Sequence, residues 1–228
     1  MKVVLLHAFP LDERMWRPQE PALVAHDVLA PNLYELDGNT TDGWAGQLLG
    51  RFDEPFVPVG ASMGGYVALA MARAAPDRVR GIVLAGSRLS ADSPERRAGR
   101  AETIELIEEE GPSGLWENQR DKLFSEDAPS EAVELAQEAA LARPVPDLVR
   151  AIEAIRDRPD SSALLGTVPM LLALGAGDQF FPVEEAREVA SGAGDTRLVV
   201  FDRSRHLPNL EQPAEFNLML TAFLQEVG

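Results

Sequence analysis

Short runs of consecutive apolar residues recur along the chain and predict buried β-strands. A strand covered on both faces has a continuous apolar sequence, whereas a strand with one wet face alternates apolar and polar residues. Most of the runs are continuous, and they cover residues 3–6, 28–30, 56–59, 82–85, 170–174 and 198–201. We therefore expect a sheet of about six strands with helices packed on both of its faces.

Segments with the apolar spacing of helices separate these strands near both ends of the chain. They cover residues 42–52, 63–75, 182–190 and 213–227. Strands that alternate with helices form βαβ units, whose right-handed crossover makes the two strands parallel. The predicted fold class is α/β, with a mainly parallel sheet.

The middle of the chain has a different pattern, charged and helix-forming, without a strand. Its helical segments cover residues 93–110, 113–124, 130–142 and 146–156. We therefore predict a core of residues 1–87 and 167–228, with residues 88–166 inserted as a helical cap. Glutamates in residues 102–110 flank an apolar stripe, so they indicate a solvated helix face rather than a metal site.

Size and charge narrow the classes of protein and partner. With 228 residues, 45% of them hydrophobic, the chain can bury a full core. Its net charge of −16 repels phosphate backbones and anionic lipid surfaces, so we expect no binding to nucleic acid or membranes. The opening apolar run is too short for a signal peptide and no later run reaches the length of a membrane span, which predicts a soluble, unexported protein.

The counts of cysteine and histidine limit the chemistry. The chain has no cysteine, which excludes a disulfide, an iron–sulfur cluster and a thiol nucleophile, and fits a cytoplasmic location. Its three histidines lack the paired spacing of metal ligands on a helix. We expect no metal and no cofactor, and a small molecule as the partner; the sequence carries no signal for an oligomeric state.

A Gly-x-Ser-x-Gly motif, residues 60–64, lies where the third predicted strand gives way to a helix. A sharp turn at this place brings strand and helix so close that side chains at Gly60 and Gly64 would collide, and it holds Ser62 in an unfavourable backbone conformation. The motif also occurs by chance in glycine-rich turns, so the rest of the chain must decide its role.

A serine nucleophile needs a base and a carboxylate that orients the base. His206 follows the last predicted strand, and Asp178 follows the preceding strand, so both would reach the carboxyl edge of the sheet. The alternatives are a turn or capping carboxylate for Asp178 and a hydrogen-bonded loop histidine for His206. Asp92, after the fourth predicted strand, is a second candidate for the orienting carboxylate, although its surroundings are better explained as the start of a helix.

Stabilisation of an oxyanion needs backbone N–H groups, and that of Met63 lies at a helix N-terminus. The second donor is expected in the loop after the first strand. Four segments together resemble the α/β hydrolase superfamily, in particular its small serine esterase and lactonase-like branch. These segments are His7-Ala8-Phe9-Pro10, Gly60-Ala61-Ser62-Met63-Gly64-Gly65, Gly175-Ala176-Gly177-Asp178 and residues 205–211.

The resemblance covers essentially the whole chain outside the cap and implies a role for each matching residue. Ser62 is the implied nucleophile, His206 the general base and then acid, and Asp178 the orienting carboxylate. The implied oxyanion hole is formed by the N–H groups of Phe9 and Met63. Two positions depart from the family, which usually has glycine where this chain has Ala8 and Arg205; the latter adds a cation beside the histidine.

Substrate-binding residues are predicted less directly. Apolar side chains near the expected site suit an acyl pocket, although each suits core packing equally well; they are Trp16, Leu89, Leu115, Trp116 and Leu207. Arg88 and Arg205 are expected near the carboxyl edge. They either bind a carboxylate of the substrate, as the resemblance to enol-lactonases suggests, or are solvated or paired with the cap, which is the favoured interpretation.

The function predicted from these residues is a serine hydrolase that cleaves a small ester, lactone or related acyl substrate through an acyl-enzyme intermediate. Haloalkane dehalogenases and epoxide hydrolases of the superfamily have aspartate at the nucleophile position, so Ser62 argues against both. An enol-lactonase or perhydrolase-like activity is an alternative. A second alternative, from a different class of function, is a ligand-binding protein that has the same fold but no catalytic activity.

Overall fold

Six parallel strands form one sheet in the computed structural model, which describes residues 1–228. The strand order is β2-β1-β3-β4-β5-β6, and each neighbouring pair is parallel. The strands are β1 Lys2–Leu6, β2 Asp27–Leu29, β3 Phe56–Ala61, β4 Ile82–Ala85, β5 Met170–Gly175 and β6 Thr196–Phe201. The predicted α/β class and the number of strands are confirmed.

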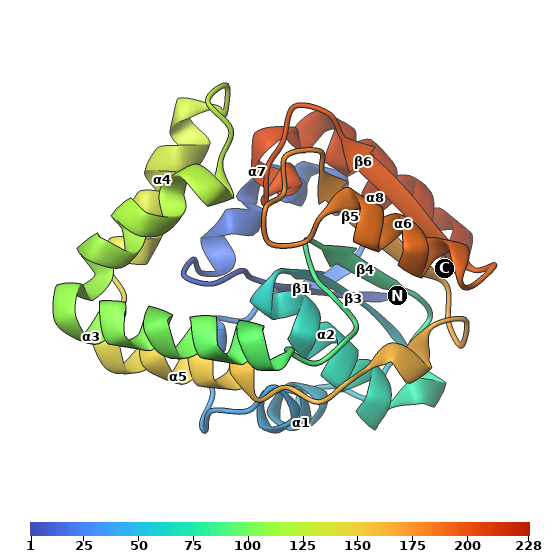
Figure 1. The fold of residues 1–228 in the computed structure, drawn as a ribbon. Helices are drawn as coiled ribbons and strands as arrows, with labels where there is room; N and C mark the ends of the chain where they lie inside the picture. Colours follow the sequence, from blue (N-terminus) through green and yellow to red (C-terminus); the bar gives the residue numbers. More distant parts are fainter.

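Helices cover both faces of this sheet and one end of it (Figure 1). The α-helices are α1 Thr41–Leu49, α2 Met63–Ala74, α3 Pro94–Leu123, α4 Ser130–Leu141, α5 Val145–Arg156, α6 Val183–Ser191, α7 Pro208–Glu211 and α8 Pro213–Val227. Short 3-10 helices occur at η1 Glu13–Ala22, η2 Leu33–Glu35, η3 Pro76–Arg78 and η4 Ser162–Leu164. Most of the α-helices agree with the apolar spacing of the sequence, whereas α7 and the four 3-10 helices were not predicted.

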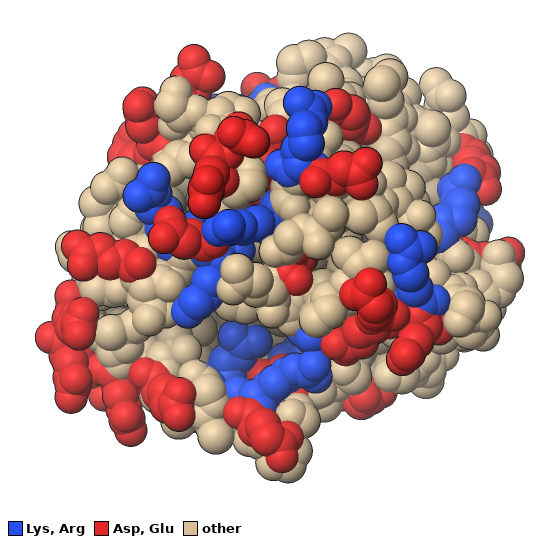
Figure 2. All heavy atoms as spheres, turned by 45° about the horizontal axis from the view of Figure 1, so that its top comes forward, with Lys and Arg blue, Asp and Glu red and all other residues tan.

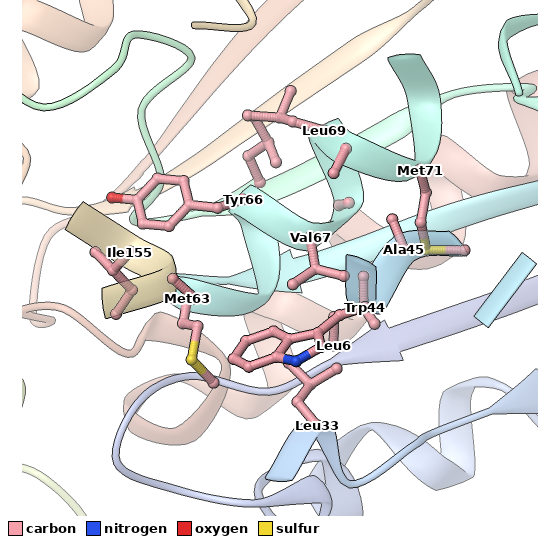
Figure 3. Close-up of a cluster of buried hydrophobic side chains, with 14 of the residues drawn as sticks. Leu6, Leu33, Trp44, Ala45, Met63, Tyr66, Val67, Leu69, Met71 and Ile155 are labelled. Atoms are coloured by element: carbon pink, nitrogen blue, oxygen red, sulfur yellow. The ribbon is translucent and has the colours of Figure 1, made fainter. Parts of the chain in front are cut away.

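The two faces of the sheet belong to two separate hydrophobic cores. Successive side chains of a strand point to opposite faces, so Val4 and Leu6 enter the core that contains α1 and α2, while Val3 and Leu5 enter the core that contains α8. Figure 3 shows part of the first core, in which Leu6 and Trp44 pack against Val67 of α2. Burial on both faces explains why the strand sequences are continuously apolar.

Between β4 and β5 the chain leaves the sheet and forms α3, α4 and α5, which lie beside the end of the sheet in Figure 1. Gly111 interrupts α3 with a φ of 69° and a ψ of −165°, followed by Pro112. This break accounts for the two helices predicted there, residues 93–110 and 113–124. The division of the chain into a core and a cap stays a prediction. None of the helices is both long and apolar enough to cross a lipid bilayer.

Candidate active site

Ser62 occupies the turn between β3 and α2. Its φ of 49° and ψ of −112° make it the one non-glycine residue with a positive φ, a conformation that costs about 1–3 kcal/mol. A methyl group on Gly60 would collide with the backbone of residues 64–65, and one on Gly64 would collide with the carbonyl group of Leu6. The spacing of glycines in the motif therefore follows from the close approach of β1, β3 and α2.

Asp178 and His206 form a buried pair at the ends of β5 and β6. The Nδ1 atom of His206 lies 2.8 Å from Oδ2 of Asp178, while Oδ1 accepts from the N–H groups of Phe180 and Phe181 at 2.8 and 3.0 Å. A carboxylate oxygen in this place pairs with an N–H group at Nδ1, and in the neutral imidazole this tautomer leaves Nε2 as the acceptor nitrogen. Asp178 is thus a turn carboxylate and the partner of His206 at once.

The backbone around His206 is arranged so that its ring can reach this place. Gly86, with a φ of 63°, lies against the ring, and a Cβ atom there would be 2.8 Å from Cε1 of His206. The His206 N–H donates to the carbonyl oxygen of Leu123 at 3.1 Å. The ring of Phe180 packs against the imidazole with 4.6 Å between centroids. The histidine loop is therefore held by the sheet on one side and by the end of α3 on the other.

Glu211 in α7 also links the histidine loop to the chain that follows α3. Its Oε1 accepts from the N–H of Arg205 at 2.8 Å, and its Oε2 accepts from the N–H of Ser125 at 2.7 Å. Burial raises the pKa of this carboxyl group. The guanidinium group of Arg205 donates to the carbonyl oxygens of Asp121 and Phe124. Arg205 thus faces the end of α3 and a separate cavity, not the one that contains His206.

A cavity of about 440 Å³ brings Ser62 and His206 together at the carboxyl end of the sheet. Five strands each contribute a following residue to its wall, namely Phe9, Ser62, Gly86, Phe180 and His206. From β1 the chain adds β2 on one side of the sheet and then β3 on the other side. Open α/β sheets bind ligands at such a reversal of strand order, which here lies between β1 and β3. Neither the Ser62 hydroxyl nor Nε2 of His206 has a hydrogen-bond partner within the protein, so both are available to a ligand.

The two predicted oxyanion donors lie at this reversal point. Phe9 lines the cavity, and its N–H makes no hydrogen bond within the protein. Met63 begins α2, and the first N–H groups of a helix have no partner inside the helix. Their position suits the binding of a negatively charged oxygen.

The structure does not bring the other apolar candidates to the cavity. Trp16 packs on Phe216 with 6.3 Å between centroids, Trp116 packs on Phe124, and Leu207 is fully buried in the core. Leu89 faces a small separate cavity of about 80 Å³, and Leu115 is also fully buried. These large apolar side chains gain more from close packing than a half-open pocket would give them.

Arg88 does line the cavity, but its charge already has a partner. Its Nε and Nη2 atoms donate to the two carboxylate oxygens of Glu185 at 2.7 and 2.8 Å, and Nη1 donates to the carbonyl oxygen of Phe180. This ion pair lowers the pKa of Glu185. The expected partner was the cap, whereas Glu185 lies on α6.

Sequence reasoning missed the polar wall that α3 contributes. Arg96, Arg100 and Thr103 all line the cavity, and their spacing of four and three residues places them on one face of the helix. That spacing was the available signal. No group of three or more His, Asp or Glu side chains is close enough to hold a metal ion.

Residues 3–217 match the family model described as the alpha/beta hydrolase family. This chain belongs to the alpha/beta hydrolase family. The predicted family, the fold and the general class of enzyme, a hydrolase, are thereby confirmed.

Individual members of the alpha/beta hydrolase family resemble the chain over its whole length. It is 31% identical to the pimeloyl-[acyl-carrier protein] methyl ester esterase of Aromatoleum aromaticum, with 96% of each chain covered. A thermophilic esterase from Thermogutta terrifontis, with malate bound, superimposes with a TM-score of 0.91 at 31% identity, covering 100% of this chain and 90% of the other. The enol-lactonase of Burkholderia xenovorans LB400, at 24% identity and a TM-score of 0.81 (98% and 91% covered), shares the fold.

Proposed function

We propose that this protein is a serine esterase in which Ser62 is the nucleophile, His206 the general base and Asp178 the residue that orients it. The observation that carries the proposal is the buried His206–Asp178 hydrogen bond, 2.8 Å long, in the loop that shares a cavity with the strained Ser62. The similarity to enzymes named as esterases supports ester bonds as the target.

In the first half-reaction, the Ser62 oxygen forms a bond to the acyl carbon while its proton passes to Nε2 of His206. The electron pair of the carbonyl double bond moves to the oxygen, which the N–H groups of Phe9 and Met63 stabilise. Asp178 stabilises the charged imidazole. The intermediate then releases the alcohol, which takes the proton from Nε2, and the acyl group stays on Ser62.

In the second half-reaction, water attacks the acyl-enzyme and gives a proton to His206. The bond from the acyl carbon to the Ser62 oxygen breaks, the serine recovers its proton from Nε2, and the carboxylic acid leaves. The proposed chemistry needs no cofactor. A cavity of about 440 Å³ suits a small acyl group.

Covalent labelling with a fluorophosphonate tests this proposal. Such a probe reacts with an activated serine, so mass spectrometry should find the added mass on Ser62, and the label should be absent from Ser62→Ala. Ser191→Ala is a matched control, because the Ser191 hydroxyl is exposed and donates to the carbonyl of Glu188. It should label like the wild type.

A correctly folded protein that does not react would contradict the esterase proposal and favour a ligand-binding role instead. The same preparation distinguishes the acceptor of the acyl group. Product formation from an ester in water, compared with that in added hydrogen peroxide, separates a hydrolase from a perhydrolase.

A further inference from the structure

The wall of the cavity opposite the sheet is basic, although the chain as a whole is strongly acidic. Arg96 and Arg100 of α3 line the cavity together with Ser62 and His206. They are four residues apart, so their side chains follow one another along the same face of the helix, about 6 Å apart along its axis.

Each of these arginines shares its carboxylate with a second arginine that holds it more closely. Arg96 reaches Glu185 at 3.4 Å, but Glu185 already binds Arg88 in two hydrogen bonds of 2.7 and 2.8 Å. Arg96 therefore makes a weak, long contact and leaves most of its donors available.

The same sharing occurs one turn further along α3. Arg100 donates to Asp92 at 3.1 Å, while buried Arg158 lies 2.8 Å from the other oxygen of Asp92. Among the residues that line the cavity, three are arginines, Arg88, Arg96 and Arg100, and Glu185 is the one carboxylate, so this wall has a formal excess of two positive charges. Asp178 does not line the cavity, and its carboxylate already accepts from His206 and two backbone N–H groups.

This excess contrasts with the rest of the molecule. The net charge of the chain is −16, and Figure 2 shows acidic side chains spread widely over one face with basic ones among them. Outside the cavity, the neighbouring Arg97 contacts Asp157 at 2.6 Å, and Arg156 contacts the same carboxylate at 2.7 Å. A positive wall beside a serine is suited to a negatively charged group of a ligand.

We infer that the ester cleaved at Ser62 carries a free carboxylate, which Arg96 and Arg100 bind through their guanidinium groups. The inference rests on the proposed function and specifies its substrate class. A planar guanidinium presents two parallel N–H donors that match the two oxygens of a carboxylate. Both the acyl half and the alcohol half of an ester can carry this group, so each half has its own arm in the test.

The test compares anionic esters with neutral esters of similar size. Monomethyl glutarate and methyl pentanoate probe a carboxylate on the acyl half, and O-acetyl lactate and 2-butyl acetate probe one on the alcohol half. The quantity measured is the ratio of kcat/KM for the anionic ester to that for the neutral ester. In Arg96→Gln/Arg100→Gln we expect this ratio to fall about tenfold to a hundredfold in one arm.

Two further variants separate binding from structural damage. Arg96→Lys/Arg100→Lys keeps both charges and should retain a ratio closer to that of the wild type. Arg97→Gln lies on the same helix turn but outside the cavity, so it should leave the ratio unchanged. An unchanged ratio in both arms for the double Gln variant would overturn the inference.

Direct binding makes this failure distinguishable from failure of the esterase proposal. Titration of glutarate into Ser62→Ala, followed by calorimetry, needs no turnover. Weaker binding after Arg96→Gln/Arg100→Gln supports the anion site even if no ester is cleaved, and equal binding contradicts it. Absence of both ester cleavage and Ser62 labelling, in contrast, contradicts the proposed reaction alone.

Discussion

At the scale of single residues, Asp178 uses both of its carboxylate oxygens for different purposes. One oxygen fixes the turn after β5 by accepting from the N–H groups of Phe180 and Phe181, and the other accepts a hydrogen bond from Nδ1 of His206. Because the turn needs its acceptor, any replacement that keeps only one acceptor oxygen must present something else to the imidazole.

Asp178→Asn tests this dependence on the second oxygen. The amide oxygen is expected to stay with the backbone N–H groups, so the NH2 group would face Nδ1 and move the histidine proton to Nε2. We expect kcat for a simple ester to fall about 10³ to 10⁴-fold, with the fold preserved in circular dichroism. Asp202→Asn, at an exposed position, is the matched control. A loss of less than tenfold would argue against the proposed role of Asp178.

Gly86 is a second residue at which one atom matters. In Gly86→Ala the new methyl group would lie 2.8 Å from Cε1 and 2.9 Å from Nδ1 of His206, in a backbone with a φ of 63°. We expect about a hundredfold loss of kcat from the displaced imidazole and about 1–2 kcal/mol lower stability in urea unfolding.

The control for that substitution is Gly46→Ala in α1, where no atom lies within 4 Å of the new Cβ. Alanine favours a helix over glycine by about 0.5–1 kcal/mol. This variant should therefore keep its activity and unfold at a slightly higher urea concentration. Equal behaviour of the two variants would contradict the account of the Gly86 contact.

At the scale of elements, His7 links the loop after β1 to η2. Its Nε2 accepts from the N–H of Leu33 at 2.8 Å, and Nδ1 lies 3.1 Å from the carbonyl oxygen of Ala8. Burial lowers the pKa of His7 from 6.5 to about 4. The imidazole is therefore neutral in the folded protein near pH 7. Its two hydrogen bonds hold the loop that carries Phe9 against η2.

This shift predicts a pH dependence of stability. Since the unfolded chain binds a proton near pH 6.5 and the folded one near pH 4, stability is present above pH 6.5 and is lost as the pH falls towards 4. The loss is about 3 kcal/mol. His7→Gln, which keeps an acceptor without titrating, should lose less over this window when both proteins are unfolded in urea at pH 7 and pH 5. Parallel losses would contradict the prediction.

At the scale of the whole molecule, the strands were predictable because burial on both faces leaves a continuous apolar sequence. Ser62 was predictable as a turn residue because the two flanking glycines report a close approach of backbones. The 3-10 helix η1 was not predictable from helical spacing, since it contains Pro18 and Pro21 and does not follow the 3.6-residue period.

The lining of the cavity was the least predictable part. Hydrophobicity indicated that Trp16 and Leu207 are buried, but it does not distinguish a core from a pocket. The pairing of Arg88 depends on Glu185, 97 residues away in the chain, and that of Arg100 depends on which helix face meets the cavity. Such contacts follow from the packing of α3 against α5 and from the ion pairs of Arg88 and Arg96 with Glu185 of α6, which are properties of the folded chain.

The bond from the His206 N–H to the carbonyl oxygen of Leu123 joins the last loop of the sheet to the end of α3. Because this amide is protected only while its hydrogen bond to Leu123 is formed, its hydrogen–deuterium exchange reports how often the end of α3 moves away from the histidine loop. An amide in β6 reports opening of the sheet instead. The difference between the exchange rates of these two amides therefore measures how independently α3 moves from the sheet that carries His206.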